Sequence, residues 1–329
     1  MYCKMIVEVN NKRIKLSALG VIVSSVMANG FAYFNLMPQH DAINHIFNTA
    51  GVWEVRMGRF MQPIYDIIRG ELLSPWLVGI ISISCLVGIV YIITCLFDID
   101  EPFGILLTAA IFSANITHTE IWSVYPYIED ITMISILLSC ISLFIILKES
   151  RYRRFSTLFL SLIFMVISIG LYQVSISFTL VMIVLLIIKN IIIHKTIRND
   201  YMRRIYKSTL ILVISVILYF LIKAAILQVL DLGEASEGHS IRFFLKNNLG
   251  DLFHRVVEVF YSMFNLFFNF TRGSMLRVSK LCNCIISILC VYIIHVVGKE
   301  NKYSIFDRLI IILLFVLSGG SKCSNVYRN

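Results

Sequence analysis

The chain has 329 residues, of which 58% are hydrophobic and 15% are charged. A soluble domain cannot bury this much apolar surface, and continuous apolar runs of about 20 residues, the length of a membrane-crossing helix, recur along the sequence. The composition therefore excludes a soluble enzyme, and the lack of alternation within the runs disfavours a β-barrel. The formal net charge of +9 does not indicate a nucleic-acid partner, because the basic residues lie in short segments between the apolar runs.

We therefore expect an all-α fold, a polytopic transmembrane helical bundle of about 10 spans, forming a single domain over residues 1–329. The expected spans are, in chain order, Leu16–Leu36, Trp76–Phe97, Pro102–Thr117, Ile131–Leu147, Phe155–Leu171, Val174–Ile193, Ser208–Leu230, Val256–Phe270, Leu281–Val297 and Ile305–Ser318. The stretch from Phe155 to Ile193 is too long for one crossing and is interrupted at Gly170-Leu171-Tyr172-Gln173, so we predict a hairpin there.

The distribution of Lys and Arg predicts a cytoplasmic N-terminus. With that orientation, 19 of the 29 basic residues fall on inner segments, nine fall on outer segments, and Lys223 lies inside a span. An excess of basic residues is typical of cytoplasmic loops. The loops of residues 37–75 and 118–130 are therefore expected outside, and the acidic turn of residues 98–101 is expected inside.

The first outer loop contains a predicted amphipathic helix. Apolar residues recur at three- and four-residue spacing, and polar residues fall on the opposite side. The apolar set is Met57, Phe60, Met61, Ile64, Ile67, Ile68 and Leu72, and the polar set is Arg59, Gln62, Asp66 and Arg69. This pattern predicts a helix that lies in the membrane interface and is started or kinked by Pro63.

Asp41 follows the first expected span directly and is the candidate catalytic residue. A carboxylate near the outer membrane surface can act as a general base that removes a proton from a sugar hydroxyl. If the leaving group is a lipid phosphate, a nearby cation can stabilise it, and Arg59 is the candidate. The structural alternative is that Asp41 caps a helix beginning at Ala42.

His40 and His45 flank Asp41 closely in sequence. They either orient Asp41, bind a substrate, or bind a divalent metal together with it. The spacing is a weak metal pattern, so no cofactor is predicted and a metal requirement is left open.

The second outer loop combines carboxylates with aromatic residues. Its candidate substrate-binding residues are Glu120, Tyr125, Tyr127, Glu129 and Asp130. Aromatic faces stack on sugar rings and carboxylates accept hydrogen bonds from sugar hydroxyls, but aromatic belts at membrane interfaces have the same composition. Asp130 is also placed to cap the helix that follows.

Three further candidates lie at or near span ends. Tyr172 and Gln173 occupy the turn of the predicted hairpin, as ordinary turn residues or as polar contacts to a substrate. Lys223 lies in the outward third of its span, where its ammonium group either extends to the outer surface or binds a lipid phosphate.

Four of these segments together resemble the bacterial membrane glucosyltransferases of the Gtr type II family, which are similar to the wider GT-C class. The segments are Gln39-His40-Asp41, Gly58-Arg59-Phe60, Tyr125-Pro126-Tyr127-Ile128-Glu129-Asp130 and Gly170-Leu171-Tyr172-Gln173. The resemblance covers most of the chain. It implies a GT-C-like multi-pass protein of the bacterial inner membrane whose periplasmic first loop carries interfacial helices.

The resemblance also implies an activity. Such an enzyme takes glucose from undecaprenyl-phosphate-glucose on the periplasmic side and adds it, with inversion, to a repeat of the lipopolysaccharide O-antigen, often as a serotype-converting function. It implies Asp41 as the base, with Arg59, Glu129 and Asp130 contacting donor or acceptor. Two departures are His40 where related chains commonly have a second acidic residue, and the abrupt end at Ser318–Asn329 where such proteins usually continue. The second departure leaves open whether the chain is truncated and whether it is active.

Three other function classes fit a polytopic protein with acidic outer loops. A transporter or flippase of lipid-linked sugars needs ionisable residues along its spans, and Lys223 is nearly the only one here. An O-antigen polymerase changes chain length rather than adding one sugar per repeat. A non-catalytic membrane protein whose outer loops bind a partner is the last alternative.

Overall fold

The computed structural model describes residues 2–35, 51–70, 74–115, 118–119, 121–122, 125–148, 154–194, 199–233 and 292. Every regular element in these ranges is a helix, which confirms the all-α prediction for the part of the chain that is described. Within these ranges, four helical segments are long and apolar enough to cross a membrane: Asn10–Phe34, Pro75–Phe97, Pro126–Leu147 and Tyr201–Val229. The same ranges contain three shorter apolar helices: Pro102–Ser113, Phe155–Leu171 and Val174–Asn190. The chain is thus consistent with a helical membrane protein, whereas the number of spans and their topology stay predictions.

The chain divides into two compact units. The first comprises Met1–Thr179 and Arg204–Ala235, and the second comprises Leu180–Arg203 and Ser236–Asn329. The prediction of a single domain stays a prediction. The expected spans Val256–Phe270, Leu281–Val297 and Ile305–Ser318 lie outside the described residues, apart from Tyr292.

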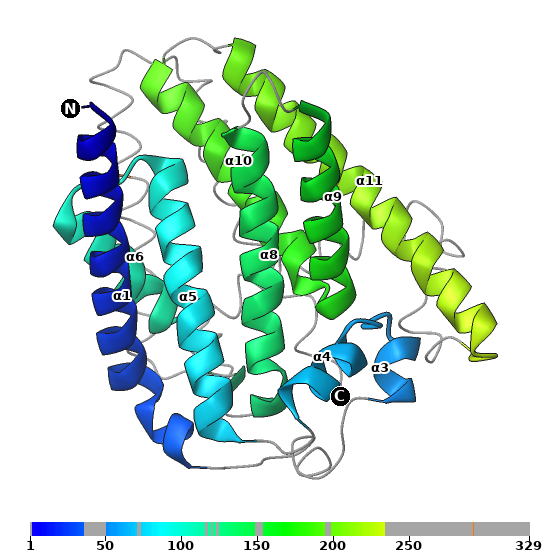
Figure 1. Cartoon of the computed structure of the whole chain (residues 1–329). Helices are drawn as coiled ribbons and strands as arrows, with labels where there is room; N and C mark the ends of the chain where they lie inside the picture. Colours follow the sequence, from blue (N-terminus) through cyan, green and yellow to red (C-terminus); the bar gives the residue numbers. More distant parts are fainter. Residues whose placement is uncertain are drawn as a thin grey trace. The chain divides into compact units, whose positions relative to one another are not determined.

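The first unit is a bundle of helices (Figure 1). Its main helices are α1 (Tyr2–Phe34), α5 (Pro75–Phe97), α6 (Pro102–Ser113), α8 (Glu129–Leu147), α9 (Arg154–Leu171) and the larger part of α11 (Asn199–Val229). Helix α1 packs against α5 and α6, α5 packs against α8, and α8 packs against α9. Helix α10 (Val174–His194) begins in this unit after a break at Tyr172 and Gln173, which confirms that residues 155–193 form two helices.

Buried serines hold α8 against α9. Ser142 and Ser161 have their Oγ atoms 2.7 Å apart, and each hydroxyl donates to the other residue's carbonyl oxygen. Ser135 and Ser168 repeat the arrangement, with donor to acceptor distances of 2.9 and 2.6 Å. Small hydroxyl side chains let two helix backbones approach closely while their polar groups remain paired, as is typical of membrane helices.

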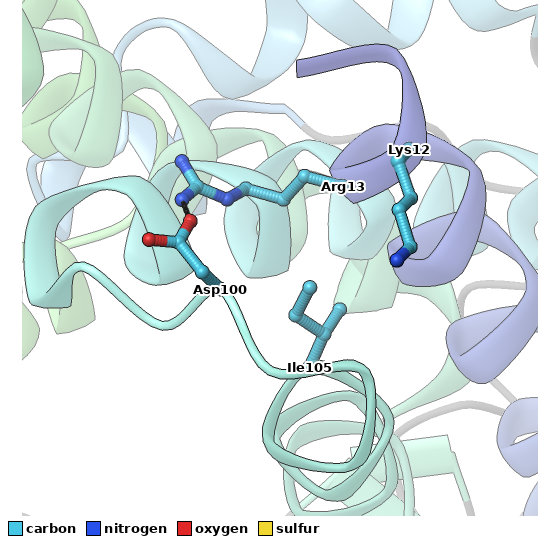
Figure 2. A pocket seen from close by; sticks show the side chains of 4 residues that line it. All are labelled: Lys12, Arg13, Asp100 and Ile105. Carbon is cyan, nitrogen blue, oxygen red and sulfur yellow. Dashed lines mark hydrogen bonds and ion pairs between the residues drawn. The ribbon is translucent and has the colours of Figure 1, made fainter. Parts of the chain in front are cut away.

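Two interactions mark one end of this unit. Arg13 on α1 pairs with Asp100 in the turn between α5 and α6, and it also donates to Cys95 Sγ at 3.0 Å. Arg13 and Asp100 line a hollow of about 300 Å³ together with Lys12 and Ile105 (Figure 2). Arg204 at the beginning of α11 donates to the carbonyl oxygen of Leu147 at the end of α8. The acidic turn therefore lies beside the basic beginning of α1, at the same end of the helices, as the alternating chain direction predicts.

The predicted helix boundaries need four corrections. Helix α1 begins at Tyr2 rather than Leu16, α6 ends at Ser113 rather than Thr117, α8 begins at Glu129 rather than Ile131, and α11 begins at Asn199 rather than Ser208. Hydropathy detects where a segment becomes apolar, whereas backbone hydrogen bonds continue past a charged residue for as long as the geometry permits. The third difference places both Glu129 and Asp130 in the first turn of α8.

Candidate functional site

The segment predicted as one amphipathic helix is, over its described residues 57–70, a turn followed by a shorter helix. Helix α3 spans Val52–Arg56 and α4 spans Gln62–Arg69, with Pro63 in the first turn of α4. Pro63 therefore starts the helix rather than kinking it, which confirms one of the two predicted alternatives. Residues 57–61 are not helical, so Met57, Phe60 and Met61 do not belong to the apolar face of α4, and that part of the prediction is wrong.

The turn between α3 and α4 docks on the end of α9. Gly58 has a φ of +90°, a conformation that glycine adopts without strain. A Cβ atom on Gly58 would lie 2.0 Å from the Tyr219 hydroxyl, and one on Gly170 would lie 2.8 Å from the Phe60 ring. The Met61 N–H donates to the Gly170 carbonyl oxygen at 3.1 Å. Two glycines thus permit the close approach of two segments that the sequence singled out separately.

Phe60 anchors this contact instead of facing lipid. Its ring stacks on that of Tyr219 on α11, with 5.8 Å between the ring centroids, and only 9% of the residue is exposed. The periodicity that placed Phe60 on an outer helix face is local, whereas its burial results from the docking of the turn on α9 and α11.

Docking brings Arg59, Tyr172 and Gln173 together. The Arg59 guanidinium lies 4.5 Å from the centroid of the Tyr172 ring, within the range of a cation–π interaction. Gln173 Nε2 donates to the Met57 carbonyl oxygen at 3.0 Å and to the Tyr219 hydroxyl at 2.9 Å. The contact with Tyr172 holds the Arg59 guanidinium, and the hydrogen bonds of Gln173 hold the turn that carries Arg59. Sequence reasoning missed Tyr219, because it lies in an apolar run with no polar pattern around it.

Gly58→Ala is expected to destabilise this docked turn more than Gly70→Ala destabilises the end of α4. Both glycines have positive φ angles, +90° and +99°, but only a Cβ on Gly58 meets another side chain. We expect a difference of about 1–3 kcal/mol in the free energy of unfolding, the cost of overpacking. Thermal unfolding of the two purified variants in the same detergent measures it. Equal losses would show that the turn is not held against Tyr219.

A second group of side chains joins α4 to α8. Arg69 lies 2.9 Å from the carboxylates of both Asp66 and Asp130, through different guanidinium nitrogens. Tyr65 donates to Asp130 at 2.7 Å, and the Ile131 N–H donates to the same carboxylate at 2.9 Å. Asp130 lies inside the first turn of α8, whose N-cap position is Ile128 and has no side-chain cap, so the prediction that Asp130 caps this helix is wrong. Arg69 neutralises part of the buried charge of Asp130.

Helix α4 therefore buries its polar side and exposes its apolar side. Gln62 and Asp66 are 1% and 3% exposed, whereas Ile67 and Ile68 are 77% and 78% exposed. A helix on a soluble protein shows the reverse. For the residues that form α4, this orientation agrees with the predicted apolar and polar faces, and it leaves the apolar side free to contact lipid.

Burial raises the pKa of the Tyr65 phenol, and the negative charge of Asp130 raises it further. The phenol consequently keeps its proton over the pH range in which proteins are stable, and it remains a hydrogen-bond donor to Asp130. Tyr65, Asp66 and Arg69 were not among the predicted site residues, although the last two were placed on the polar side of the helix.

Glu129 faces a third group of residues. His118 Nδ1 lies 3.0 Å from Glu129 Oε1, and both side chains are buried. Nearby, Trp122 and Tyr33 pack edge to face with ring centroids 4.9 Å apart. Tyr127 packs against this pair and also against the apolar residues around Ile128.

The other predicted site residues are placed as follows. Tyr125 packs edge to face on Tyr127 at 6.3 Å, and Lys223 lies on α11 one helical turn after Tyr219 and is 9% exposed. His40, Asp41 and Glu120, together with His45, lie outside the described residues. Among the described residues, no group of three or more His, Cys, Asp or Glu side chains is arranged to hold a metal ion. A metal site at residues 40–45 therefore stays a hypothesis from the sequence.

Comparison with known protein families identifies the family to which this chain belongs. A family model described as Glucosyl transferase GtrII matches residues 30–320, a range that includes all four segments on which the resemblance rests. No curated protein and no solved structure matches the chain. Because the matched range covers most of the sequence, the resemblance is confirmed, and the chain belongs to the GtrII glucosyl transferase family.

Proposed function

We propose that the protein transfers glucose from undecaprenyl-phosphate-glucose to a repeat of the lipopolysaccharide O-antigen, on the periplasmic face of the bacterial inner membrane, and so converts the serotype of its host. The observation that carries the proposal is the position of Arg59, held by Tyr172 beside the expected outer turn of residues 172–173 in a chain of the GtrII family. This geometry supports a phosphate-bearing donor.

Arg59 is suited to stabilise the leaving group. When the bond between C1 of glucose and the phosphate oxygen breaks, its electron pair goes to that oxygen, and the phosphate gains negative charge. A guanidinium group can bind such a phosphate through two parallel hydrogen bonds. Arg69 forms ion pairs with two carboxylates, whereas Arg59 forms none within the described part of the chain. Lys223 on α11 is a candidate second cation for the same phosphate.

Asp41 is the proposed general base. It accepts the proton of the acceptor hydroxyl while that oxygen forms a bond to C1 on the side opposite the phosphate, which inverts the configuration at C1. The proposal rests on its position in the sequence, six residues after Asn35 near the end of α1. His40 is proposed to orient it, and a divalent metal bound by His40, Asp41 and His45 is a variant of the same mechanism.

The carboxylates of the second outer loop are proposed to have different roles. Asp130 already accepts hydrogen bonds from Tyr65, Arg69 and Ile131, so it positions α4 rather than contacting a sugar. Glu129 and Glu120 remain candidates for sugar hydroxyls, with Tyr125 and Tyr127 as stacking surfaces. Tyr172 and Gln173 hold the turn that carries Arg59.

The test is mass spectrometry of lipopolysaccharide repeats from a host that expresses the chain and synthesises the donor. We expect one added hexose per repeat, which is absent when donor synthesis is deleted. Unchanged repeats combined with movement of labelled lipid-linked glucose across vesicles would instead support a flippase. A changed distribution of chain lengths without added hexose would support a polymerase.

A further inference from the structure

Four polar or aromatic side chains form a closed cluster at the beginning of α8, which we call the Glu129 cluster. Its members are Tyr33 at the end of α1, His118 and Trp122 in the connection between α6 and α8, and Glu129 in the first turn of α8. They are 4%, 3%, 3% and 0% exposed, respectively. The cluster comes from three parts of the chain that lie far apart in the sequence.

Several polar atoms of the cluster lack a partner. Within the described part of the chain, no hydrogen bond is made by Glu129 Oε2, His118 Nε2 or Trp122 Nε1. Buried polar atoms are nearly always paired, and leaving one unpaired costs free energy. Three such atoms in one cluster therefore indicate that a ligand completes their hydrogen bonds.

The chemistry of these atoms selects the kind of ligand. A carboxylate accepts a hydrogen bond from a hydroxyl, an indole N–H donates one, and an imidazole does either. Aromatic faces add stacking surface. An anionic ligand is disfavoured, because Glu129 has an acceptor-only carboxylate when ionised. A neutral, polyhydroxylated molecule, such as a sugar, fits all three groups.

The location distinguishes this cluster from the site around Arg59. Tyr33 and Trp122 pack with Val78 of α5, whereas Arg59 and Phe60 lie against the end of α9 and Tyr219 of α11. Helix α8 packs against both α5 and α9, and the two groups are built on different neighbours of this helix. The cationic group suits a phosphate, and the acidic, aromatic group suits a neutral sugar.

We infer that the Glu129 cluster is the subsite for the acceptor sugar, with Glu129 and His118 binding its hydroxyl groups and Trp122 stacking on its ring. This inference rests on the proposed function and assigns one of its two substrates. Since all four side chains are closed off from solvent, the sugar enters only when Trp122 turns away from Tyr33. Binding must therefore change the environment of the indole.

Tryptophan fluorescence tests the subsite without relying on activity. The chain has three tryptophans, and Trp53 and Trp76 are exposed, so the double variant Trp53→Phe/Trp76→Phe leaves Trp122 as the only emitter. This full-length variant in phospholipid nanodiscs is titrated with the methyl glycosides of glucose, galactose, rhamnose and N-acetylglucosamine. We expect a saturable change with at least one glycoside, and an apparent Kd that Glu129→Gln raises about tenfold, the effect of losing one charged hydrogen bond.

The matched control is Ser139→Ala, a buried polar residue of α8 that bonds within its own helix. It should leave the titration unchanged. No saturable change with any glycoside overturns the inference, and so does an equal loss of binding in Glu129→Gln and Ser139→Ala.

Steady-state kinetics provide the second measurement. In Glu129→Gln we expect the KM for the acceptor to rise about tenfold, while the KM for the donor and the slow hydrolysis of donor in the absence of acceptor stay unchanged. An equal loss in all three quantities would mean that Glu129 is only structural and would overturn the inference. If the unsubstituted protein neither transfers nor hydrolyses donor, the proposed function fails, and the Trp122 titration alone decides whether the subsite binds sugar.

Discussion

Asp41→Asn is expected to lower the rate of hexose transfer by about 10²–10⁴-fold, the range that a positioned general base contributes. The amide that replaces the carboxylate has almost the same shape but cannot accept the proton of the acceptor hydroxyl at neutral pH. The KM values for donor and acceptor should change little, because binding does not require proton transfer. Transfer of labelled glucose by the reconstituted protein, at saturating donor and acceptor, measures the rate.

Asp98→Asn is the matched control for Asp41→Asn. Asp98 follows α5 at the Arg13 end of the first unit and has a φ of +54°, a conformation that asparagine accepts as readily as aspartate. The same chemical change there should leave both membrane insertion and transfer intact. Full transfer by a correctly inserted Asp41→Asn protein would remove Asp41 from the mechanism and direct attention to Glu120 and Glu129.

Arg69→Met is expected to lower the free energy of unfolding by about 3–5 kcal/mol, the cost of breaking a buried ion pair from one side. Methionine fills much of the space but leaves Asp66 and Asp130, which are 3% and 0% exposed, without their cation. Thermal unfolding in detergent measures the loss. Because Arg69 is the ionic connection between α4 and α8, transfer should fall as well.

A double-mutant cycle shows whether this loss comes from the charge. Asp130→Asn removes one carboxylate, so Arg69→Met should cost less in the Asp130→Asn background than in the unsubstituted protein. Arg56→Met is the matched control, since Arg56 donates to the Gly233 carbonyl oxygen at an exposed position, and it should change stability by only about 0.5 kcal/mol. If Arg69→Met costs no more than Arg56→Met, the network does not hold α4 in place.

The sequence alone determined the helical class, the break within residues 155–193, the chain reversal that brings residues 98–101 back to the end at which α1 begins, and the two faces of α4. Each of these depends on local information: the length of an apolar run, the interruption by Gly170-Leu171-Tyr172-Gln173, and the spacing of Ile64, Ile67 and Ile68. The spacing of apolar residues determines the faces of a helix wherever the helix packs, because helix geometry repeats every 3.6 residues. The membership of the GtrII family was also readable from four short segments.

Only the tertiary structure decided which of these residues meet. Arg59 and Tyr172 are separated by more than a hundred residues, and Arg69 and Asp130 by 61. Their pairing depends on how α4, α8 and α9 are offset along one another, which no local pattern specifies. The same holds for the inward position of Phe60, and for His118 beside Glu129. Apolar periodicity determines which side of a helix is buried, whereas the chemistry of the site depends on which helix ends come together.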